Sequence, residues 1–336
     1  MTPAIFGLSG PVLTDDERAF FREVEPAGYI LFGRNVETRT QLRALTDDLR
    51  EIDGRERLAI LIDQEGGRVA RMKPPEWPAF PAGPRFDALY EVSPMAAIEA
   101  ARVNAQAIAI TLAEVGITVD CLPLLDVATP ATHAIIGDRA LGSEPLRVAA
   151  MGRAMLDGLR RGGVVGVVKH MPGHGRATVD SHHDLPRVAA SDAELASDLQ
   201  PFAALAGAPM GMTAHVVYEA WDAERPGTLS PVVVRDIIRG RIGFDGLLMT
   251  DDIDMKALSG SAGEKGAAAL AAGVDVVLDC WGRMDEMADI VARCPAMTDD
   301  ARARLDRAMA TLDDGREDAG LAALIEKRDA LLSNAA

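Results

Sequence analysis

The sequence predicts an α/β fold in the form of a single (β/α)8 barrel of the TIM type. Two observations predict it: short apolar runs alternate with helical patterns, and polar residues follow almost every run. Runs that are apolar throughout are typical of parallel strands buried on both faces. Eight such runs favour a closed barrel over a doubly wound sheet, and 336 residues are enough to build one.

The strands are expected where the apolar runs lie. Most of the runs are rich in β-branched residues or leucine, as is typical of buried strands. We expect the eight strands at residues 5–8, 28–32, 58–62, 117–122, 164–168, 209–212, 247–250 and 274–278.

Helical patterns fill the intervals between these strands. Ser191 with Glu194 predicts a capping box, and Ser230 predicts a second helix start because a proline follows it. Long helical patterns at residues 95–115 and 146–161, and charged helices at 301–336, complete a single barrel domain over residues 1–336.

Composition excludes several functional classes. The chain has 35 basic and 51 acidic residues, and its net charge of −16 argues against binding to nucleic acids or anionic membrane surfaces, which require a basic face. No apolar run approaches the ~18–20 residues of a membrane-spanning helix, and the first residues lack the pattern of a targeting segment. The three cysteines are odd in number and scattered, which argues against a disulfide framework. We therefore expect a cytoplasmic protein.

Polar side chains follow the predicted strands almost every time. In a barrel, the carboxyl ends of the strands converge on one face, which is where catalytic groups lie. Any single one of these side chains can instead cap the following helix. The residues are Arg34, Asp63, Asp126, Lys169, His170, His215, Asp251, Asp252 and Asp279.

A histidine-rich loop follows the fifth predicted strand. Four of the six histidines lie between His170 and His183, and glycines and a proline prevent a helix there. Imidazole beside a carboxylate is suited to proton transfer near neutral pH. Two alternatives remain open: a metal site made by His170, His174, His182 and an aspartate, or hydrogen bonds by which His174 or His183 only holds the loop. The His-x-His pair typical of barrel metallohydrolases is missing from the sequence.

Two further segments carry candidate functional groups. Asp63 ends a strand and can accept hydrogen bonds from sugar hydroxyls, while the arginines that follow can donate them. The alternative for Arg68 is a salt bridge with Glu65 or Asp63. Asp251 at the end of the seventh strand is a candidate nucleophile or electrostatic stabiliser. We expect only one of Asp251 and its neighbour to face the barrel axis, because side chains alternate along a strand.

At these motifs the chain resembles the β-N-acetylglucosaminidases of glycoside hydrolase family 3 that act in bacterial peptidoglycan recycling. The most specific part is Lys-His-x-Pro-Gly-His-Gly followed by Asp-Ser-His. Thr250, Met171 and Ala70 stand where serine, phenylalanine and glutamine are common, and none of these changes removes a reacting group. The similarity lies at residues 28–35, 63–71, 136–139, 169–175, 180–182, 212–215 and 243–252.

The resemblance implies a role for each matching residue. Asp251 corresponds to the nucleophile, His182 to the proton donor and acceptor, and Asp180 to the carboxylate that orients His182. Such an arrangement suits a retaining glycosidase, which needs a nucleophile and a proton donor on opposite sides of the anomeric carbon. The residues implied to hold the terminal N-acetylglucosamine are Asp63, Arg71, Arg139, Lys169 and His170.

The resemblance also implies a reaction. It is the release of terminal, non-reducing β-linked N-acetylglucosamine from muropeptides with an anhydro-muramic leaving group, without a metal or an organic cofactor. We expect Arg71, Arg139 and Lys169 to attract the anionic substrate, and a monomer or weak homodimer with small-molecule partners only. A metal-dependent amidohydrolase and a sugar-binding or sensing protein are the alternative functions.

Overall fold

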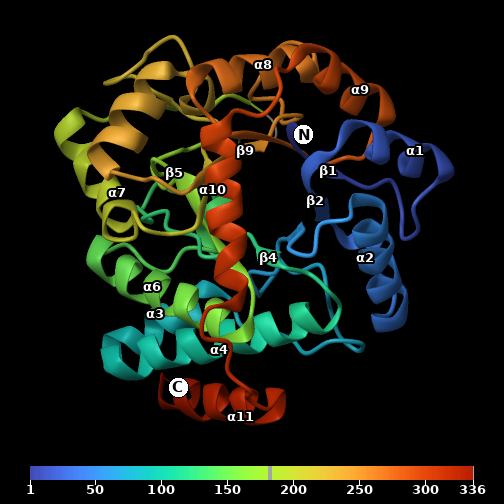
Figure 1. Ribbon diagram of the computed structural model, residues 1–336. Coiled ribbons are helices and arrows are strands. Elements are labelled where there is room, and N and C mark those ends of the chain that lie inside the picture. Colours follow the sequence, from blue (N-terminus) through green and yellow to red (C-terminus); the bar gives the residue numbers. More distant parts are fainter. Residues whose placement is uncertain (181–183, 336) are drawn as a thin grey trace.

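The structure is a computed structural model that describes residues 1–180 and 184–335. Eight parallel strands form a closed barrel in the order β1-β10-β9-β7-β5-β4-β3-β2, and helices surround it (Figure 1). The predicted fold class is therefore confirmed.

All eight predicted strands are present, with ends that shift slightly. The fourth strand is the shortest, because only Val119 and Asp120 pair in regular register with both neighbouring strands. Backbone hydrogen bonds from Thr118 to Ile60 (3.1 Å) and from Cys121 to Ile62 (2.9 Å) nevertheless extend that pairing. The barrel strands are β1 (Thr2–Gly7), β2 (Pro26–Leu31), β3 (Ala59–Ile62), β4 (Val119–Asp120), β5 (Val165–Met171), β7 (Met210–Thr213), β9 (Leu247–Asp252) and β10 (Val276–Asp279).

The predicted helix starts are confirmed. Ser191 and Glu194 form the expected capping box, and the N–H of Val233 donates to Ser230 Oγ (3.2 Å) at the second start. The helices are α1 (Asp15–Val24), η1 (Gly33–Asn35), α2 (Arg39–Asp53), α3 (Gly83–Val92), α4 (Pro94–Glu114), α5 (Ala134–Gly137), α6 (Pro145–Gly162), α7 (Asp192–Ala204), η2 (Gly227–Leu229), the π-helix η3 (Val233–Ile242), α8 (Ala262–Ala272), α9 (Met284–Arg293), α10 (Asp299–Ala310), η4 (Thr311–Asp313), α11 (Leu321–Leu332) and η5 (Ser333–Ala335).

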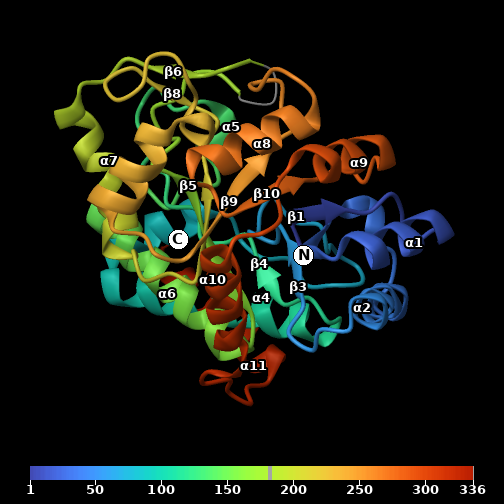
Figure 2. The same cartoon turned by 45° about the horizontal axis from the view of Figure 1, so that its top comes forward.

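Two short strands lie outside the barrel. The strands β6 (Arg187–Val188) and β8 (Val217–Tyr218) pair in parallel and form a separate two-stranded sheet. In Figure 2 this sheet lies at one end of the barrel, and α10 and α11 lie at the other end. Because β6 and β8 follow barrel strands β5 and β7 along the chain, the small sheet stands on the side where the strands end.

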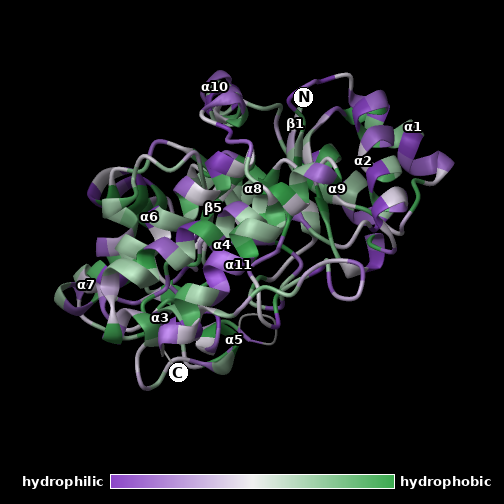
Figure 3. Ribbon diagram, turned by 90° about the horizontal axis from the view of Figure 1, so that it is seen from below, coloured by the Kyte–Doolittle hydropathy of each residue, from purple (hydrophilic) through white to green (hydrophobic). Residues whose placement is uncertain are grey.

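The interior of the barrel is an apolar core that α10 closes from below. Side chains from all eight strands fill it, and Leu305, Ala308 and Met309 of α10 belong to the same buried cluster. The outer core lies between the strands and the helices. Hydrophilic residues are frequent on α1, α2 and α10 in Figure 3. The packed interior leaves the carboxyl ends of the strands as the place for a site.

Small residues allow two of the outer helices to pack closely. A Cβ atom on Gly158 of α6 would lie 2.1 Å from the backbone oxygen of Arg102 in α4. A Cβ atom on Gly162 would lie 2.3 Å from Cβ of Ala109. The α4–α6 contact therefore depends on glycine at these positions.

Within the described ranges, none of the helices combines the length and the apolar character needed to cross a membrane.

Candidate active site

A cavity of about 310 Å³ opens at the carboxyl ends of the barrel strands. Six of the predicted site residues line it: Asp63, Arg71, Arg139, Lys169, His170 and Asp251. Asp180 is partly buried and is not among the described residues that line the cavity. His182 lies outside the described residues. The structure thus brings together the residues predicted to hold the sugar and the predicted nucleophile, although their roles stay predictions.

Asp63 sits directly after β3 and forms two ion pairs. Its Oδ1 accepts a hydrogen bond from Lys169 Nζ (3.0 Å), and its Oδ2 accepts one from Nη2 of Arg71 (2.9 Å). Burial opposes ionisation, but the charges of Lys169 and Arg71 outweigh it and hold the pKa of Asp63 well below its usual range. Asp63 is therefore a carboxylate, able to accept hydrogen bonds from sugar hydroxyls.

Glu65 is a member of this cluster that the sequence analysis considered only as a partner of Arg68. Its carboxylate accepts two hydrogen bonds from Arg139 (2.7 and 2.8 Å) and lies 2.6 Å from Lys169 Nζ. Burial raises the pKa of Glu65, but Lys169 and Arg139 lower it to about 2. The signal that could have found Glu65 is its spacing of two residues from Asp63, which in extended chain places both side chains on one side.

The alternative considered for Arg68, a salt bridge with Glu65 or Asp63, does not occur among the described residues. Arg68 Nε instead lies 2.5 Å from Asp138 Oδ1, and its Nη2 donates to the backbone oxygens of Ala134 and Ile135. The reason is that Lys169 and Arg139 already occupy the Glu65 carboxylate. Arg68 therefore joins the two loops at the rim of the cavity.

The charges of the sugar-binding candidates compensate one another. Arg71, Arg139 and Lys169 are each paired with Asp63 or Glu65. The carboxylates of Asp63 and Glu65 offset much of the positive charge of these three side chains. This pairing argues against the expectation that the three cations attract an anionic substrate. What remains is a rigid set of N–H donors and carboxylate acceptors, which suits hydroxyl groups more than a formal charge.

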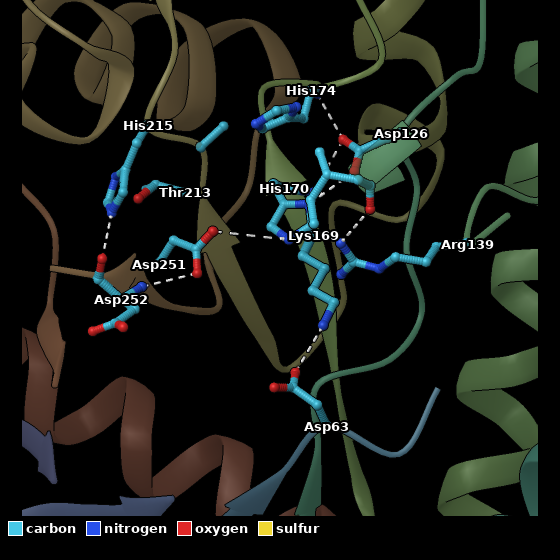
Figure 4. A network of polar contacts seen from close by, with 12 residues as sticks. Asp63, Asp126, Arg139, Lys169, His170, His174, Thr213, His215, Asp251 and Asp252 are labelled. Carbon is cyan, nitrogen blue, oxygen red and sulfur yellow. Dashed lines mark hydrogen bonds and ion pairs between the residues drawn. The ribbon is translucent and has the colours of Figure 1, made fainter. Parts of the chain in front are cut away.

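His170 lies between two carboxylates of the site (Figure 4). Its Nδ1 is 2.8 Å from Asp126 Oδ2, and its Nε2 is 3.9 Å from Asp251 Oδ2. Asp126 is fully buried and also accepts hydrogen bonds from the backbone N–H groups of His170 (3.2 Å) and His174 (2.6 Å). Asp126 therefore fixes both the imidazole ring and the start of the loop that carries it.

The two adjacent aspartates at the end of β9 lie in different environments. The Asp251 carboxylate points toward His170 in Figure 4 and accepts a hydrogen bond from the N–H of Asp252 (2.8 Å). Burial opposes its ionisation, but His170 and His215 hold the pKa of Asp251 below its usual range. Asp252 also lines the cavity, but burial raises its pKa to about 6, and it accepts hydrogen bonds from Asp254 and Cys280. Asp251 is thus the ionised carboxylate that faces the imidazole.

The remaining histidines of the strand ends are buried. The backbone N–H of His174 donates a hydrogen bond to Asp126, and burial lowers the pKa of the His174 ring to about 4. The rings of His170 and His174 lie 5.9 Å apart. His215 bridges Thr228 Oγ1 (2.7 Å) and the backbone oxygen of Asp252 (2.9 Å), which anchors the end of β9. Among the described residues, no group of three or more His, Cys, Asp or Glu side chains is arranged to hold a metal ion.

Comparisons with known proteins agree with this geometry. Residues 11–311 match the family described as glycosyl hydrolase family 3 N terminal domain. A β-hexosaminidase of Bordetella avium is 36% identical over 296 residues, which are 87% of this chain and 83% of that protein. One of Chromobacterium violaceum is 37% identical over 310 residues, 91% of this chain and 86% of that protein.

A solved structure is similar over the whole chain. It is the crystal structure of NagZ from Neisseria gonorrhoeae in complex with N-trifluoroacetyl-D-glucosamine. The TM-score is 0.86 at 29% sequence identity, covering 100% of this chain and 98% of that one. These matches confirm the resemblance carried by the motifs: the chain belongs to glycosyl hydrolase family 3, in its β-hexosaminidase branch.

Proposed function

We propose that this chain, a β-N-acetylhexosaminidase of glycosyl hydrolase family 3, removes terminal non-reducing β-linked N-acetylglucosamine from muropeptides by a retaining double displacement. One observation carries the proposal. The ionised Asp251 lies near the end of β9, and Asp63, a hydroxyl-binding candidate, follows β3 on the opposite side of the eight-strand ring. A single sugar ring can therefore lie between a nucleophile and a set of hydrogen-bonding groups.

In the proposed first step, Asp251 attacks the anomeric carbon. A new bond forms between a carboxylate oxygen and that carbon, and the bond to the leaving-group oxygen breaks. The low pKa of Asp251 supports this role, because the nucleophile must be ionised at neutral pH. Water then cleaves the glycosyl-enzyme and restores the carboxylate.

The protons of this scheme are assigned to His182, which Asp180 orients. His182 gives a proton to the leaving-group oxygen in the first step and takes one from water in the second. Both assignments rest on the family motif, since His182 lies outside the described residues.

In this proposal the sugar is held by the paired charges at the ends of β3 and β5. Asp63 accepts hydrogen bonds from hydroxyl groups, and Lys169, Arg139 and Arg71 donate them. Because Nδ1 of His170 faces Asp126, its Nε2 is directed to the cavity near Asp251. The five predicted binding residues all line the cavity that would receive the ring, which supports the proposal.

The proposed setting is the recycling of peptidoglycan in the cytoplasm. The substrate there is an N-acetylglucosaminyl-anhydro-muropeptide, a small molecule that a monomer or weak homodimer can bind without other partners. The net charge of −16 supports a function without nucleic acid.

The substrate class is tested with a pair of chromogenic glycosides. A purified enzyme is incubated with an aryl N-acetyl-β-glucosaminide and with the matching β-glucoside. We expect rapid release of the phenol from the first substrate alone, and unchanged rates after exhaustive chelation. Binding of N-acetylglucosamine without turnover would instead indicate a sugar sensor, and loss of activity on chelation would indicate a metal-dependent hydrolase.

A further inference from the structure

Asp279 is a buried acidic residue for which the proposed reaction has no role. It is the last residue of β10, and its side chain is fully buried. Neither of its carboxyl oxygens has a hydrogen-bond partner within the described part of the chain. A buried polar group without a partner costs free energy, and a buried charge without one costs far more. The position of Asp279 therefore favours the neutral form of its carboxyl.

The side chain of Asp279 points away from the barrel axis. Leu278 and Cys280 belong to the cluster inside the barrel, so Asp279 between them faces the outer layer. Its register partner on β1 is Phe6, a buried member of the outer core, and α9 packs against the same strand. This apolar surrounding explains why no donor of residues 1–180 or 184–335 completes a hydrogen bond with the carboxyl.

The charged groups around Asp279 shift its titration toward neutral pH. Burial raises the pKa of Asp279, and the negative charges of Asp252 and Glu286 raise it further, to about 7. The backbone N–H of Trp281 lies outside hydrogen-bond geometry, and together with the charge of Arg283 it opposes this shift without overcoming it. The charged groups that interact with Asp279 are Asp252 of β9, Glu286 of α9, Arg283 before α9 and Arg34 after β2.

The residue after Asp279 holds two groups of the site. The carbonyl of Cys280 accepts a hydrogen bond from Arg34 Nη2, and its N–H donates to Asp252 Oδ1 (3.3 Å). The N–H of Asp252 in turn donates to Oδ1 of Asp251 (2.8 Å). A displacement of the end of β10 is therefore transmitted to the candidate nucleophile through these backbone hydrogen bonds.

The turn after β10 is packed tightly against the end of β1. A Cβ atom on Gly7 would lie 2.2 Å from the carbonyl oxygen of Cys280. Gly282 has φ +67°, and a Cβ atom there would lie 2.5 Å from the carbonyl carbon of Leu8. Because the backbones are in such close contact, a carboxylate at Asp279 cannot reach solvent by rotation of its side chain alone. Ionisation therefore displaces the backbone of residues 279–282.

We propose that Asp279 is a positioning residue of the active site, whose neutral carboxyl keeps the end of β10 packed against β1. Loss of its proton displaces Cys280, and with it Arg34 and the hydrogen bonds that orient Asp251. The neutral form is the active one, and the rate falls as the proton leaves. This control goes beyond the proposed function, and only its effect on the rate rests on the proposed role of Asp251.

Trp281 reports on this end of the strand without a substrate. Its indole is 52% exposed and lies 5.8 Å from the Arg34 guanidinium. We expect its fluorescence emission to move to longer wavelength as the pH rises, with a midpoint at about 7. Trp281→Phe identifies this signal among the three tryptophans of the chain. Asp279→Asn and Asp279→Val cannot ionise and abolish the shift, and the valine variant suits the apolar surrounding if the amide disturbs folding.

The charges around Asp279 give a directional test. Glu286→Gln removes an acidic group that raises the pKa of Asp279, so the midpoint of the emission change moves to lower pH by roughly 0.5 unit. Asp285→Asn is the matched control, because Asp285 is the adjacent acidic residue of α9 but has an exposed side chain. Water and salt screen its charge, so this variant leaves the midpoint unchanged.

The rate is measured over the same pH range with an aryl N-acetyl-β-glucosaminide whose phenol is acidic, since such a leaving group needs little protonation. We expect the wild-type kcat to fall roughly threefold or more across the transition. This fall is absent in Asp279→Asn and Asp279→Val.

Urea unfolding gives a further measurement that needs no substrate. The raised pKa of Asp279 contributes stability that is present while the group is protonated in both states and is lost as the pH rises toward 7. We therefore expect the urea midpoint of the wild type to fall over this range, and the fall to be smaller in Asp279→Asn and Asp279→Val.

A wild-type emission that does not change with pH, or a shift that persists in both Asp279 variants, would overturn the inference. So would a midpoint that stays or rises in Glu286→Gln, or a fall of kcat that both Asp279 variants share with the wild type. If emission and unfolding behave as expected but the wild type releases no phenol, the proposed function fails while the pH-dependent strand end is retained.

Discussion

At the scale of single residues, Asp126 controls which nitrogen of His170 carries a proton. Asp126 Oδ1 accepts two backbone N–H groups, so that only Oδ2 faces Nδ1 of the ring. Nδ1 must then donate, because a carboxylate only accepts. The tautomer of His170 and the position of Nε2 beside Asp251 both follow from this one buried carboxylate.

The variant Asp126→Asn tests this control. The amide oxygen would take the place of Oδ1, and the amide NH2 would face Nδ1 and force the other tautomer. We expect kcat to fall roughly 10- to 100-fold with a smaller change in KM, and the pH profile of kcat to shift. Asp275→Asn is the control, since Asp275 is also buried but pairs with Arg239 and Arg304 far from the cavity. An unchanged rate and pH profile in Asp126→Asn would contradict the assignment.

Glu65 gives a second prediction at this scale, about stability. Its pKa falls from 4.5 in the unfolded chain to about 2 in the fold, where burial is outweighed by Lys169 and Arg139. A lowered pKa contributes stability that is present above pH 4.5 and is lost as the pH falls toward 2. Glu65→Gln should therefore lower the free energy of unfolding by about 3 kcal/mol at neutral pH, with a smaller difference at acid pH.

Glu99→Gln is the matched control for this prediction. The pKa of Glu99 is also about 2, mainly through its hydrogen bond with Arg102, but its side chain is 33% exposed. Water screens such a pair, so we expect a loss below about 1 kcal/mol. Urea unfolding at several pH values measures both variants. Equal losses at Glu65 and Glu99 would show that burial does not strengthen the cluster.

At the scale of elements, the contact between α4 and α6 depends on the absence of a side chain. Gly158→Ala would place a Cβ against the backbone of α4, which cannot move as a flexible side chain can. We expect a loss of about 1–3 kcal/mol in the free energy of unfolding. Gly207→Ala is the control, because nothing lies within 4 Å of a Cβ there. A lower midpoint of thermal unfolding in Gly207→Ala alone would contradict this explanation.

The elements that the sequence predicts well are those with a local pattern. The eight strands are continuous apolar runs, and the capping box at Ser191 is a local hydrogen-bond pattern. The two-residue strands β6 and β8 were missed because two residues carry no periodicity. The π-helical hydrogen bonding of η3 was missed as well, since the side chains of Val233–Ile242 follow an ordinary helical pattern.

At the scale of the whole molecule, the closed ring of strands brings distant residues together. Sequence analysis could predict that polar residues after the strands converge, because this follows from barrel topology. It could not predict their pairing. Glu65 and Arg139 are 74 positions apart, and nothing in the local sequence indicates that Glu65 binds Arg139 and Lys169 while Arg68 binds Asp138.

The closed ring also separates the apolar core from the candidate site. Its lower end is sealed by α10, whose Leu305, Ala308 and Met309 complete the interior core. Its upper end holds the charged groups, so a substitution at Asp251, whose side chain is 14% exposed, removes little apolar packing. This separation makes Asp251 the position at which chemistry can be tested with little effect on the fold.

The central claim is that Asp251 forms a covalent bond to the sugar. We would trap the intermediate with a slow-reacting fluorinated N-acetylglucosaminyl substrate, digest the protein and locate the added mass by tandem mass spectrometry. The account predicts one N-acetylglucosaminyl-type adduct, on Asp251. It also predicts that Asp251→Ala loses the adduct and on the order of 10³-fold or more in turnover, with an unchanged melting temperature. An adduct on Asp252 or another residue, or near-normal turnover of Asp251→Ala, would contradict it.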